Sequence, residues 1–470
     1  MFAHIMELER ATCVLTLTAT VAAAAATVYL FEPRLPFWFA EAVWPGRRRR
    51  EAMHQPVMDA DDEDPPTWVS DMGRIRELLL GTKLRDFLKD RHKGRPEGVP
   101  PPRDVLVLTP SCTVNDALTK LSERAVLGAP YLRDDGKDFL GFVDLHDIVH
   151  ALVSHMFPPG PLGTMASHDA PDWFLTDDSP ACADRILTLV RDKGGDFCDR
   201  TLGSIRRRVG DGAFIRVDET DHSLLDVIQT HFVNAQYTKP PVRHRVAVYK
   251  YAVRYPYASR LTDAETTIEV TDVFSVSDIT RFLNRWNELE KCLTPCSIVD
   301  IGVGSTRVDA VPKDAALLRC FAVMERVGVS GLGVTDDGKL IGSVSESDLR
   351  RITADRLDVL AMPVCEFIGK LHALSGEDNP LREDQMALAR AHPLFRGALR
   401  TGELTGGRLN VTVSQKATLL EVIRALARNR VHRVYAVNET TGVADRVVTH
   451  SDLVRFFALF APSDLSLIHI

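Results

Sequence analysis

One pattern recurs four times along the chain and constrains its fold more than any other feature. In each copy a helical segment is followed by a short apolar strand, a turn and a second strand, which ends in a short polar sequence and continues into an amphipathic helix. The four endings read DLHD at 144–147, SVSD at 275–278, SESD at 345–348 and THSD at 449–452. Internal repeats of this kind pack against one another to complete a core, so we expect an α/β protein made of four β-α-β-β-α units.

The repeats are unevenly spaced, which locates the insertions. The four aspartates at 147, 278, 348 and 452 are 131, 70 and 104 positions apart, and the shortest interval represents the bare repeat. One insertion is expected at about 250–266. We therefore divide the chain into an N-terminal extension with an apolar segment at 11–31 and an acidic linker (1–66), repeat 1 (67–157), a linker (158–193), repeat 2 (194–290), repeat 3 (291–357), repeat 4 with a long polar lead-in (358–460) and a tail (461–470).

The apolar segment 11–31 has two interpretations. It carries no charge, is about long enough to span a bilayer, and is followed by the basic cluster 47–50, which would keep the rest of the chain in the cytoplasm. Its residues are mostly Ala and Thr, however, and a non-spanning, targeting or disordered extension explains it equally well. We thus expect a cytoplasmic protein or a membrane-anchored one whose repeats face the cytoplasm.

The composition excludes several classes of function. A net charge of −7 argues against a general nucleic-acid binder, which needs a basic face. The eight cysteines lack the paired spacing of a zinc site, and we expect no metal. The sequence contains no P-loop, kinase catalytic loop, H-E-x-x-H or G-x-S-x-G motif, so we expect no enzymatic activity and no catalytic residues.

The four endings carry the chemistry of a nucleotide site. An aspartate at a helix start can accept hydrogen bonds from a ribose diol, and a preceding hydroxyl with the helix N-terminal amides can meet a phosphate. The candidate ribose contacts are Asp147, Asp278, Asp348 and Asp452, and the candidate hydroxyls are Ser275, Ser345 and Thr449. Asp144 takes the hydroxyl position in repeat 1, where a carboxylate would repel phosphate. The alternative is that these residues only cap their helices.

Two His-Arg pairs form the second candidate feature. His244-Arg245 and His432-Arg433 stand within short apolar strands of repeats 2 and 4, and the guanidinium fork suits phosphate. Repeats 1 and 3 have glycine-containing sequences at roughly the same place. We therefore expect about one to three sites, with repeats 2 and 4 supplying most phosphate contacts. The alternative is an exposed edge or pairing with nearby carboxylates.

These motifs resemble the CBS (cystathionine-beta-synthase) domain over roughly residues 68–460. Four copies without a catalytic domain resemble the gamma regulatory subunit of AMP-activated and sucrose-non-fermenting-type kinases, closest to plant-type gamma-like proteins. The sequences that carry this resemblance are VHRVYAV at 431–437, VDIGVG at 299–304 and GKLIGSVSESDLR at 338–350. The resemblance implies that repeats 1 and 2, and repeats 3 and 4, pair through their sheets. It also implies AMP, ADP or ATP as ligands and protein kinase catalytic and scaffold subunits as partners.

Two other functions stay open on the sequence alone. The segment 11–31 favours a membrane-anchored CBS scaffold or a sensor of another adenosyl ligand. Asp144, with the missing basic residues of repeats 1 and 3, favours a protein-interaction module that binds no nucleotide.

Overall fold

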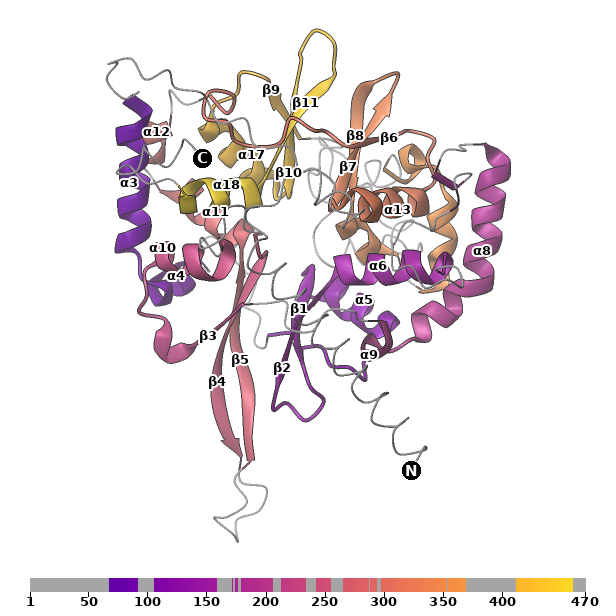
Figure 1. Cartoon of the computed structure of the whole chain (residues 1–470), viewed down its shortest axis with the longest axis horizontal. Helices are drawn as coiled ribbons and strands as arrows, with labels where there is room; N and C mark the ends of the chain where they lie inside the picture. Colours follow the sequence, from indigo (N-terminus) through magenta and orange to yellow (C-terminus); the bar gives the residue numbers. More distant parts are fainter. Residues whose placement is uncertain are drawn as a thin grey trace, which may run out of the picture. The chain divides into compact units, whose positions relative to one another are not determined.

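A computed structural model describes residues 67–91, 105–158, 171, 174–175, 179–205, 213–233, 242–254, 265–286, 288–293, 297–352, 354–368 and 411–459 (Figure 1). The apolar segment 11–31, expected as an N-terminal helix, and the tail 461–470 lie outside these residues. Within the described ranges, no helix has the length and apolar character needed to cross a membrane.

Three repeats share one sheet topology, in which a short first strand runs parallel to the second, and the second pairs antiparallel with the third. These sheets are β3 (Ala213–Arg216), β4 (Arg245–Arg254) and β5 (Glu265–Ser275) in repeat 2; β6 (Ala310–Pro312), β7 (Gly331–Asp336) and β8 (Lys339–Ser345) in repeat 3; and β9 (Thr412–Ser414), β10 (Arg433–Val437) and β11 (Ala444–Thr449) in repeat 4. Repeat 1 has the hairpin β1 (Gly128–Leu132) and β2 (Phe139–Asp144), and a single parallel bridge from Leu108 replaces the first strand. The mixed α/β fold of repeated units is confirmed.

The helices differ more between repeats than the sequence pattern predicts. Repeat 1 has α5 (Val114–Glu123) and α6 (Leu145–Met156); repeat 2 has α10 (Leu224–Val227), η3 (Ile228–Val233) and α11 (Val276–Arg285); repeat 3 has α13 (Leu317–Val327) and η4 (Glu346–Arg351); repeat 4 has α17 (Leu419–Asn429) and α18 (His450–Leu459). In repeat 3 the expected second amphipathic helix is instead the short 3-10 helix η4. The buried Leu349 lies within η4, and the buried Ile352 follows three positions later as the residue that ends it.

The described residues at both ends of the expected insertion near 250–266 lengthen a hairpin, and residues 255–264 lie outside the described ranges. Strands β4 and β5 pair from Arg245 opposite Ser275 to Arg254 opposite Glu265. The parallel partner β3 covers only the first part of β4, from Val246 to Tyr249. The rest of β4 and β5 therefore forms a two-stranded ribbon that extends past β3 (Figure 1).

Paired repeats exchange the segments that precede them. The segment before α4 (Leu84–Asp90) forms a bridge to the first helix of repeat 2, and the segment before α9 (Leu202–Ile205) forms one to the first helix of repeat 1. The equivalent exchange joins repeats 3 and 4. The four bridges are Lys83–Ser223, Thr113–Thr201, Ser297–Thr418 and Ala316–Pro363. Each segment packs on the partner repeat, so the contacts follow the expected pairing of 1 with 2 and 3 with 4.

The sheets also contact each other within each pair. In the first pair, the ring of Phe214 from β3 lies 3.8 Å from the ring of Phe139 and 5.7 Å from that of Phe142, both on β2. In the second pair, Ser305 and Val447 exchange two backbone hydrogen bonds of 2.8 and 2.9 Å. The hairpins also meet directly, because the backbone N–H of Ile268 donates to the carbonyl of Gly136 at 2.8 Å, and that of Leu340 donates to the carbonyl of Gly442 at 3.0 Å.

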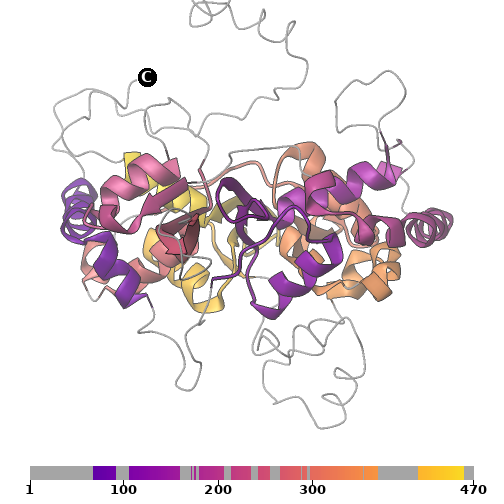
Figure 2. The same cartoon turned by 90° about the horizontal axis from the view of Figure 1, so that it is seen from below.

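The helices pack across the pairs, and this divides the apolar core in two. Buried residues of repeats 1 and 3 form one cluster, where α6 packs on α13 and η4. Buried residues of repeats 2 and 4 form the other, where α11 packs on α17 and α18 and where α3 (Thr67–Gly81) and α12 (Leu289–Leu293) add to the core. Figure 2 shows these two groups on opposite sides.

Part of the expected linker 158–193 is helical. The helix α8 (Pro180–Asp199) begins with Ser179 as its cap and packs against α6 and η5 (Ala354–Ala361). It contributes Ile186 and Val190 to the core of repeats 1 and 3, which explains why the segment is ordered as a helix. The segment was expected to be a linker because it is rich in polar residues and contains Pro180, but proline is well tolerated at the first position of a helix.

Candidate functional site

Every repeat begins its second helix with a reciprocal pair of hydrogen bonds. The aspartate of the ending accepts the backbone N–H three positions earlier, at 3.1 Å in repeat 1 and 2.8 Å in the others. In repeats 2, 3 and 4 the Ser or Thr at that earlier position also donates its hydroxyl to the aspartate, at 2.7, 3.3 and 2.7 Å. The aspartates are Asp147, Asp278, Asp348 and Asp452. Helix capping is therefore one role of these residues, and ribose contact stays a prediction.

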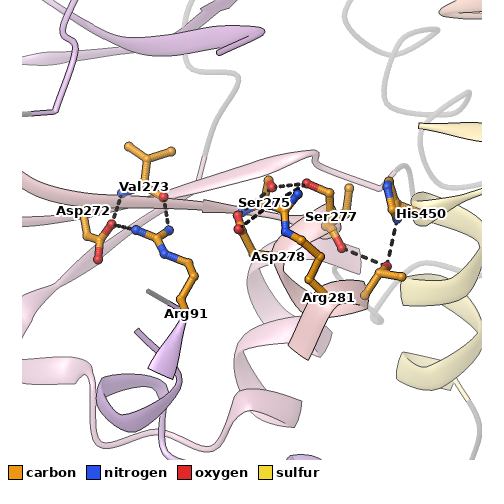
Figure 3. A network of polar contacts seen from close by, with 10 residues as sticks. Arg91, Asp272, Val273, Ser275, Ser277, Asp278, Arg281 and His450 are labelled. Carbon is orange, nitrogen blue, oxygen red and sulfur yellow. Dashed lines mark hydrogen bonds and ion pairs between the residues drawn. The ribbon is translucent and has the colours of Figure 1, made fainter. Parts of the chain in front are cut away.

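Asp278 of repeat 2 belongs to a network of polar contacts (Figure 3). Its second carboxylate oxygen accepts a 2.6 Å hydrogen bond from Arg281, and the neighbouring hydroxyls of Ser275 and Ser277 are 2.8 Å apart. Burial would raise the pKa of Asp278, but the positive charges of Arg281 and Arg91 outweigh it and the pKa lies below its ordinary value. The carboxylate is thus ionised and bonded to Arg281, while Arg91, which bonds Asp272 and the carbonyl of Val273, adds positive charge nearby.

The strand registers align the arginines with two glycines. Arg245 lies opposite Ser275, and Arg433 lies opposite Thr449. At the same register position, repeat 1 has Gly128 opposite Asp144 and repeat 3 has Gly331 opposite Ser345. The two histidines, expected within the strands, lie one residue before them, because β4 begins at Arg245 and β10 at Arg433.

Each arginine reaches across to the glycine of the paired repeat. Arg433 donates to the carbonyl of Gly331 and to the hydroxyl of Ser330 at 2.8 Å, while Arg245 donates to the Asp144 carboxylate at 3.1 Å. A Cβ atom on Gly331 would lie 2.5 Å from the Arg433 guanidinium carbon. The missing side chains of repeats 1 and 3 are therefore what gives the arginines of repeats 2 and 4 their space.

Positive charge concentrates around His432. Desolvation by the surrounding protein, followed by the charges of His450, Arg245, Arg433 and Arg350, lowers the pKa of His432 to about 3. Desolvation and the charge of Arg245 also lower the pKa of His244. Both imidazoles are therefore neutral near pH 7, where they can donate a hydrogen bond but add no charge. The charge available for an anion comes from the guanidinium groups.

Three residues inside the endings were not predicted from the sequence. His146 in repeat 1 bonds Glu346 in repeat 3 at 2.7 Å, and His450 in repeat 4 bonds Thr280 in repeat 2 at 2.9 Å. Both contacts join repeats that pack through their helices. The only sequence signal for these contacts is that polar residues stand between the capping residue and the aspartate. The partners of His146 and His450 lie 200 and 170 positions away in the sequence, so no local pattern identifies them.

The predicted site residues thus differ between the pair of repeats 1 and 2, which we call the first module, and the pair of repeats 3 and 4, the second module. Arg245 meets Asp144, whereas Arg433 meets neutral acceptors on the strand that lies opposite Ser345. The four aspartates stand at four separate helix starts, and each is bonded within its own ending. Across the described ranges, no cluster of three or more His, Cys, Asp or Glu side chains has the arrangement of a metal site.

Comparisons with known proteins identify three of the repeats. The CBS domain family model matches residues 100–154, 300–355 and 408–459, which correspond to repeats 1, 3 and 4. The chain therefore contains CBS domains in three places, and repeat 2 shares the sheet topology of repeats 3 and 4. Among curated proteins, none matches the chain.

Several solved structures are similar to this chain. Protein MJ1225 from Methanocaldococcus jannaschii, described as a candidate archaeal homologue of g-AMPK, is 14% identical with a TM-score of 0.42, covering 76% of this chain and 98% of that one. An uncharacterized conserved protein from Pyrococcus horikoshii is 13% identical with a TM-score of 0.33, covering 75% and 96%. The CBS domain of a CBS-domain-containing membrane protein from Sphaerobacter thermophilus is 13% identical with a TM-score of 0.23, covering 45% and 95%.

Proposed function

We propose that this CBS-repeat protein is a non-catalytic regulatory subunit that binds an adenine nucleotide between repeats 3 and 4. The placement of Arg433 supports this proposal most directly. Its guanidinium group crosses from repeat 4 to repeat 3 and is held by a carbonyl and a hydroxyl, neither of which cancels its charge. A phosphate can therefore replace two neutral acceptors and gain a charge-assisted, bidentate pairing.

The groups around Arg433 fit the rest of a nucleotide. Thr449 lies directly opposite it in the sheet, and Ser345 lies opposite Gly331, so both candidate hydroxyls belong to strand ends beside the guanidinium. Asp348 and Asp452 follow three positions later and are the candidate ribose contacts. AMP, ADP and ATP share this ribose and phosphate chemistry and differ in the number of charges that would meet Arg433.

The proposed regulatory role rests on the resemblance to gamma subunits. Bound nucleotide would change how the repeats contact a protein kinase catalytic or scaffold subunit in the cytoplasm. Such a switch requires that AMP, ADP and ATP differ in affinity between two states of the complex. Purification of the full chain from its native cells, followed by identification of bound proteins, tests this part, and recovery without any kinase subunit would contradict it.

Isothermal titration calorimetry of the full chain with AMP, ADP and ATP tests nucleotide binding. We expect saturable binding of at least one nucleotide and a loss of at least tenfold in affinity in Arg433→Met, which removes the charge and keeps much of the side-chain volume. Arg428→Met serves as the control, because Arg428 is exposed near the end of α17. Absence of binding at millimolar nucleotide would exclude the proposal and favour a protein-interaction module.

A further inference from the structure

The two modules have the same framework around their crossing arginine. Arg245 and Arg433 begin equivalent strands, and each lies over a glycine of the paired repeat. An ideal Cβ on Gly128 would lie 3.0 Å from the Arg245 guanidinium nitrogen and closer still to Asp144 and Val143 of its own hairpin, whereas one on Gly331 would meet the Arg433 guanidinium group first. Differences between the two sites therefore arise from the residues that receive each guanidinium group.

The main difference is the residue that caps the next helix. Opposite Gly128 this residue is Asp144, and opposite Gly331 it is Ser345. One oxygen of Asp144 accepts the backbone N–H of Asp147 at 3.2 Å, and the other accepts Arg245 at 3.1 Å. Both charged side chains are mostly buried, with 15% of Arg245 and 27% of Asp144 exposed. The carboxylate is thus held at both oxygens.

We infer that Asp144 takes the place of a nucleotide phosphate at Arg245, so that the first module is closed to phosphate by the chain's own carboxylate. This inference rests on the proposed function, and it explains why the sequence holds two His-Arg pairs but only one open site. The ligand excluded from the first module is any adenine nucleotide with a charged phosphate tail.

The physical reason is competition between two anions for one guanidinium. Arg245 already has a charged partner within the same chain, which needs no ligand to be immobilised. A phosphate that approached would also face repulsion from Asp144 and lose its contact with a hydroxyl donor, because a carboxylate only accepts hydrogen bonds. In the second module the serine at the same position presents neither obstacle. One carboxylate does act on Arg433 there, that of the buried Glu346, which is itself bonded to His146 of repeat 1.

Removal of the carboxylate should open the first module. Serine is as good a helix cap as aspartate, so Asp144→Ser should keep the start of α6. Equilibrium dialysis with labelled AMP should show one additional nucleotide per chain in Asp144→Ser, and Asp144→Ser/Arg245→Met should lose it. The control is Glu439→Ser, which changes the net charge equally in the exposed turn between β10 and β11 and should bind as the wild-type chain does.

The reciprocal change tests the inference even if Asp144→Ser fails to fold. Ser345→Asp should capture Arg433 and lower the affinity for AMP at least tenfold more than Ser345→Ala, which removes only the hydroxyl. Equal losses in these two variants, or no additional nucleotide in folded Asp144→Ser while the wild-type chain binds, would overturn the inference and leave the proposed function standing. Absence of binding in the wild-type chain would overturn the proposed function itself.

Discussion

At the scale of single residues, a missing side chain matters as much as a charged one. The Arg433 guanidinium occupies the space that any side chain on Gly331 would need. The sequence showed glycines in repeats 1 and 3 near the position of the arginines, and we interpreted them as a loss of binding groups. The structure shows that each glycine instead accommodates the arginine of its partner, which is a long-range contact that no local pattern reveals.

Gly331→Ala should therefore displace Arg433 without unfolding the protein. The atoms that a new Cβ would meet belong to the end of a flexible side chain, so the expected loss of stability is small, within about 1 kcal/mol. Nucleotide affinity should fall at least tenfold, because the guanidinium moves from its acceptors. Thermal denaturation and calorimetry measure the two effects, and an unchanged affinity would argue against Arg433 as the phosphate contact.

Asp452 should combine two roles that a second variant can separate. Asp452→Ala removes the hydrogen bonds to the backbone N–H and hydroxyl of Thr449, and should lower the free energy of unfolding by about 1 kcal/mol. It should also weaken nucleotide binding. Thr418→Ala removes a comparable cap at the start of α17, away from the helix-start aspartates, and should affect stability alone. Equal affinities in the two variants would limit Asp452 to capping.

At the scale of elements, short apolar runs separated by a turn predicted the hairpins well, whereas the helices depended on their surroundings. In repeat 1, for example, the second strand β2 ends at Asp144, the first residue of the DLHD ending. The 3-10 form of η4 and the helix α8 were not predicted, because both depend on packing against residues of another repeat. The domain boundaries remain a prediction, since paired repeats exchange segments across them.

Two adjacent glycines in α8 should respond differently to alanine. A Cβ on Gly194 would lie 2.6 Å from a methyl carbon of Leu357 in η5, whereas a Cβ on Gly195 has nothing within 4 Å. Gly195→Ala should therefore stabilise the protein by about 0.5–1 kcal/mol, because alanine favours the helix. Gly194→Ala should gain less or destabilise the protein, because the buried Leu357 side chain would have to leave its place between α8 and η5. Chemical denaturation of both variants compares them directly, and equal effects would contradict the close packing of α8 on η5.

At the scale of the whole described molecule, two His-Glu pairs join repeat 1 to repeat 3. His146 contacts Glu346 at 2.7 Å, and His150, one turn later on α6, contacts Glu325 at 2.5 Å. The corresponding contact between repeats 2 and 4 joins His450 to the neutral Thr280. The two helix interfaces therefore differ in charge, and among the described residues only the first contains these His-Glu pairs.

The first interface should weaken at alkaline pH. The hydrogen bond to Glu346 raises the pKa of His146 from 6.5 to about 9, with further support from the charges of Glu346, Asp144 and Glu325. Because the folded pKa exceeds the unfolded one, the stabilisation is complete below about pH 6.5 and is lost as the pH rises through about 9. The ring is 44% exposed, so we expect a decrease of only about 1 kcal/mol over this range.

Denaturation of the wild-type chain and of His146→Gln between pH 6.5 and 9 measures this effect. The variant should lose less stability over the range than the wild-type chain does. His222→Gln is the control, because His222 is exposed in a turn of repeat 2 and should behave as wild type. An identical pH dependence in all three proteins would exclude His146 as the titrating group.

The sequence by itself determined the repeating unit, because the short apolar strands, the turns between them and the helix-start aspartates are local signals that recur in each copy. It also showed that the two His-Arg pairs belong to repeats 2 and 4. Only the tertiary structure decided which groups those arginines meet. Arg245 and Asp144 lie 101 positions apart, and Arg433 and Gly331 lie 102 apart. Contacts at such separations depend on how whole repeats pair and pack, which periodicity within one repeat does not encode.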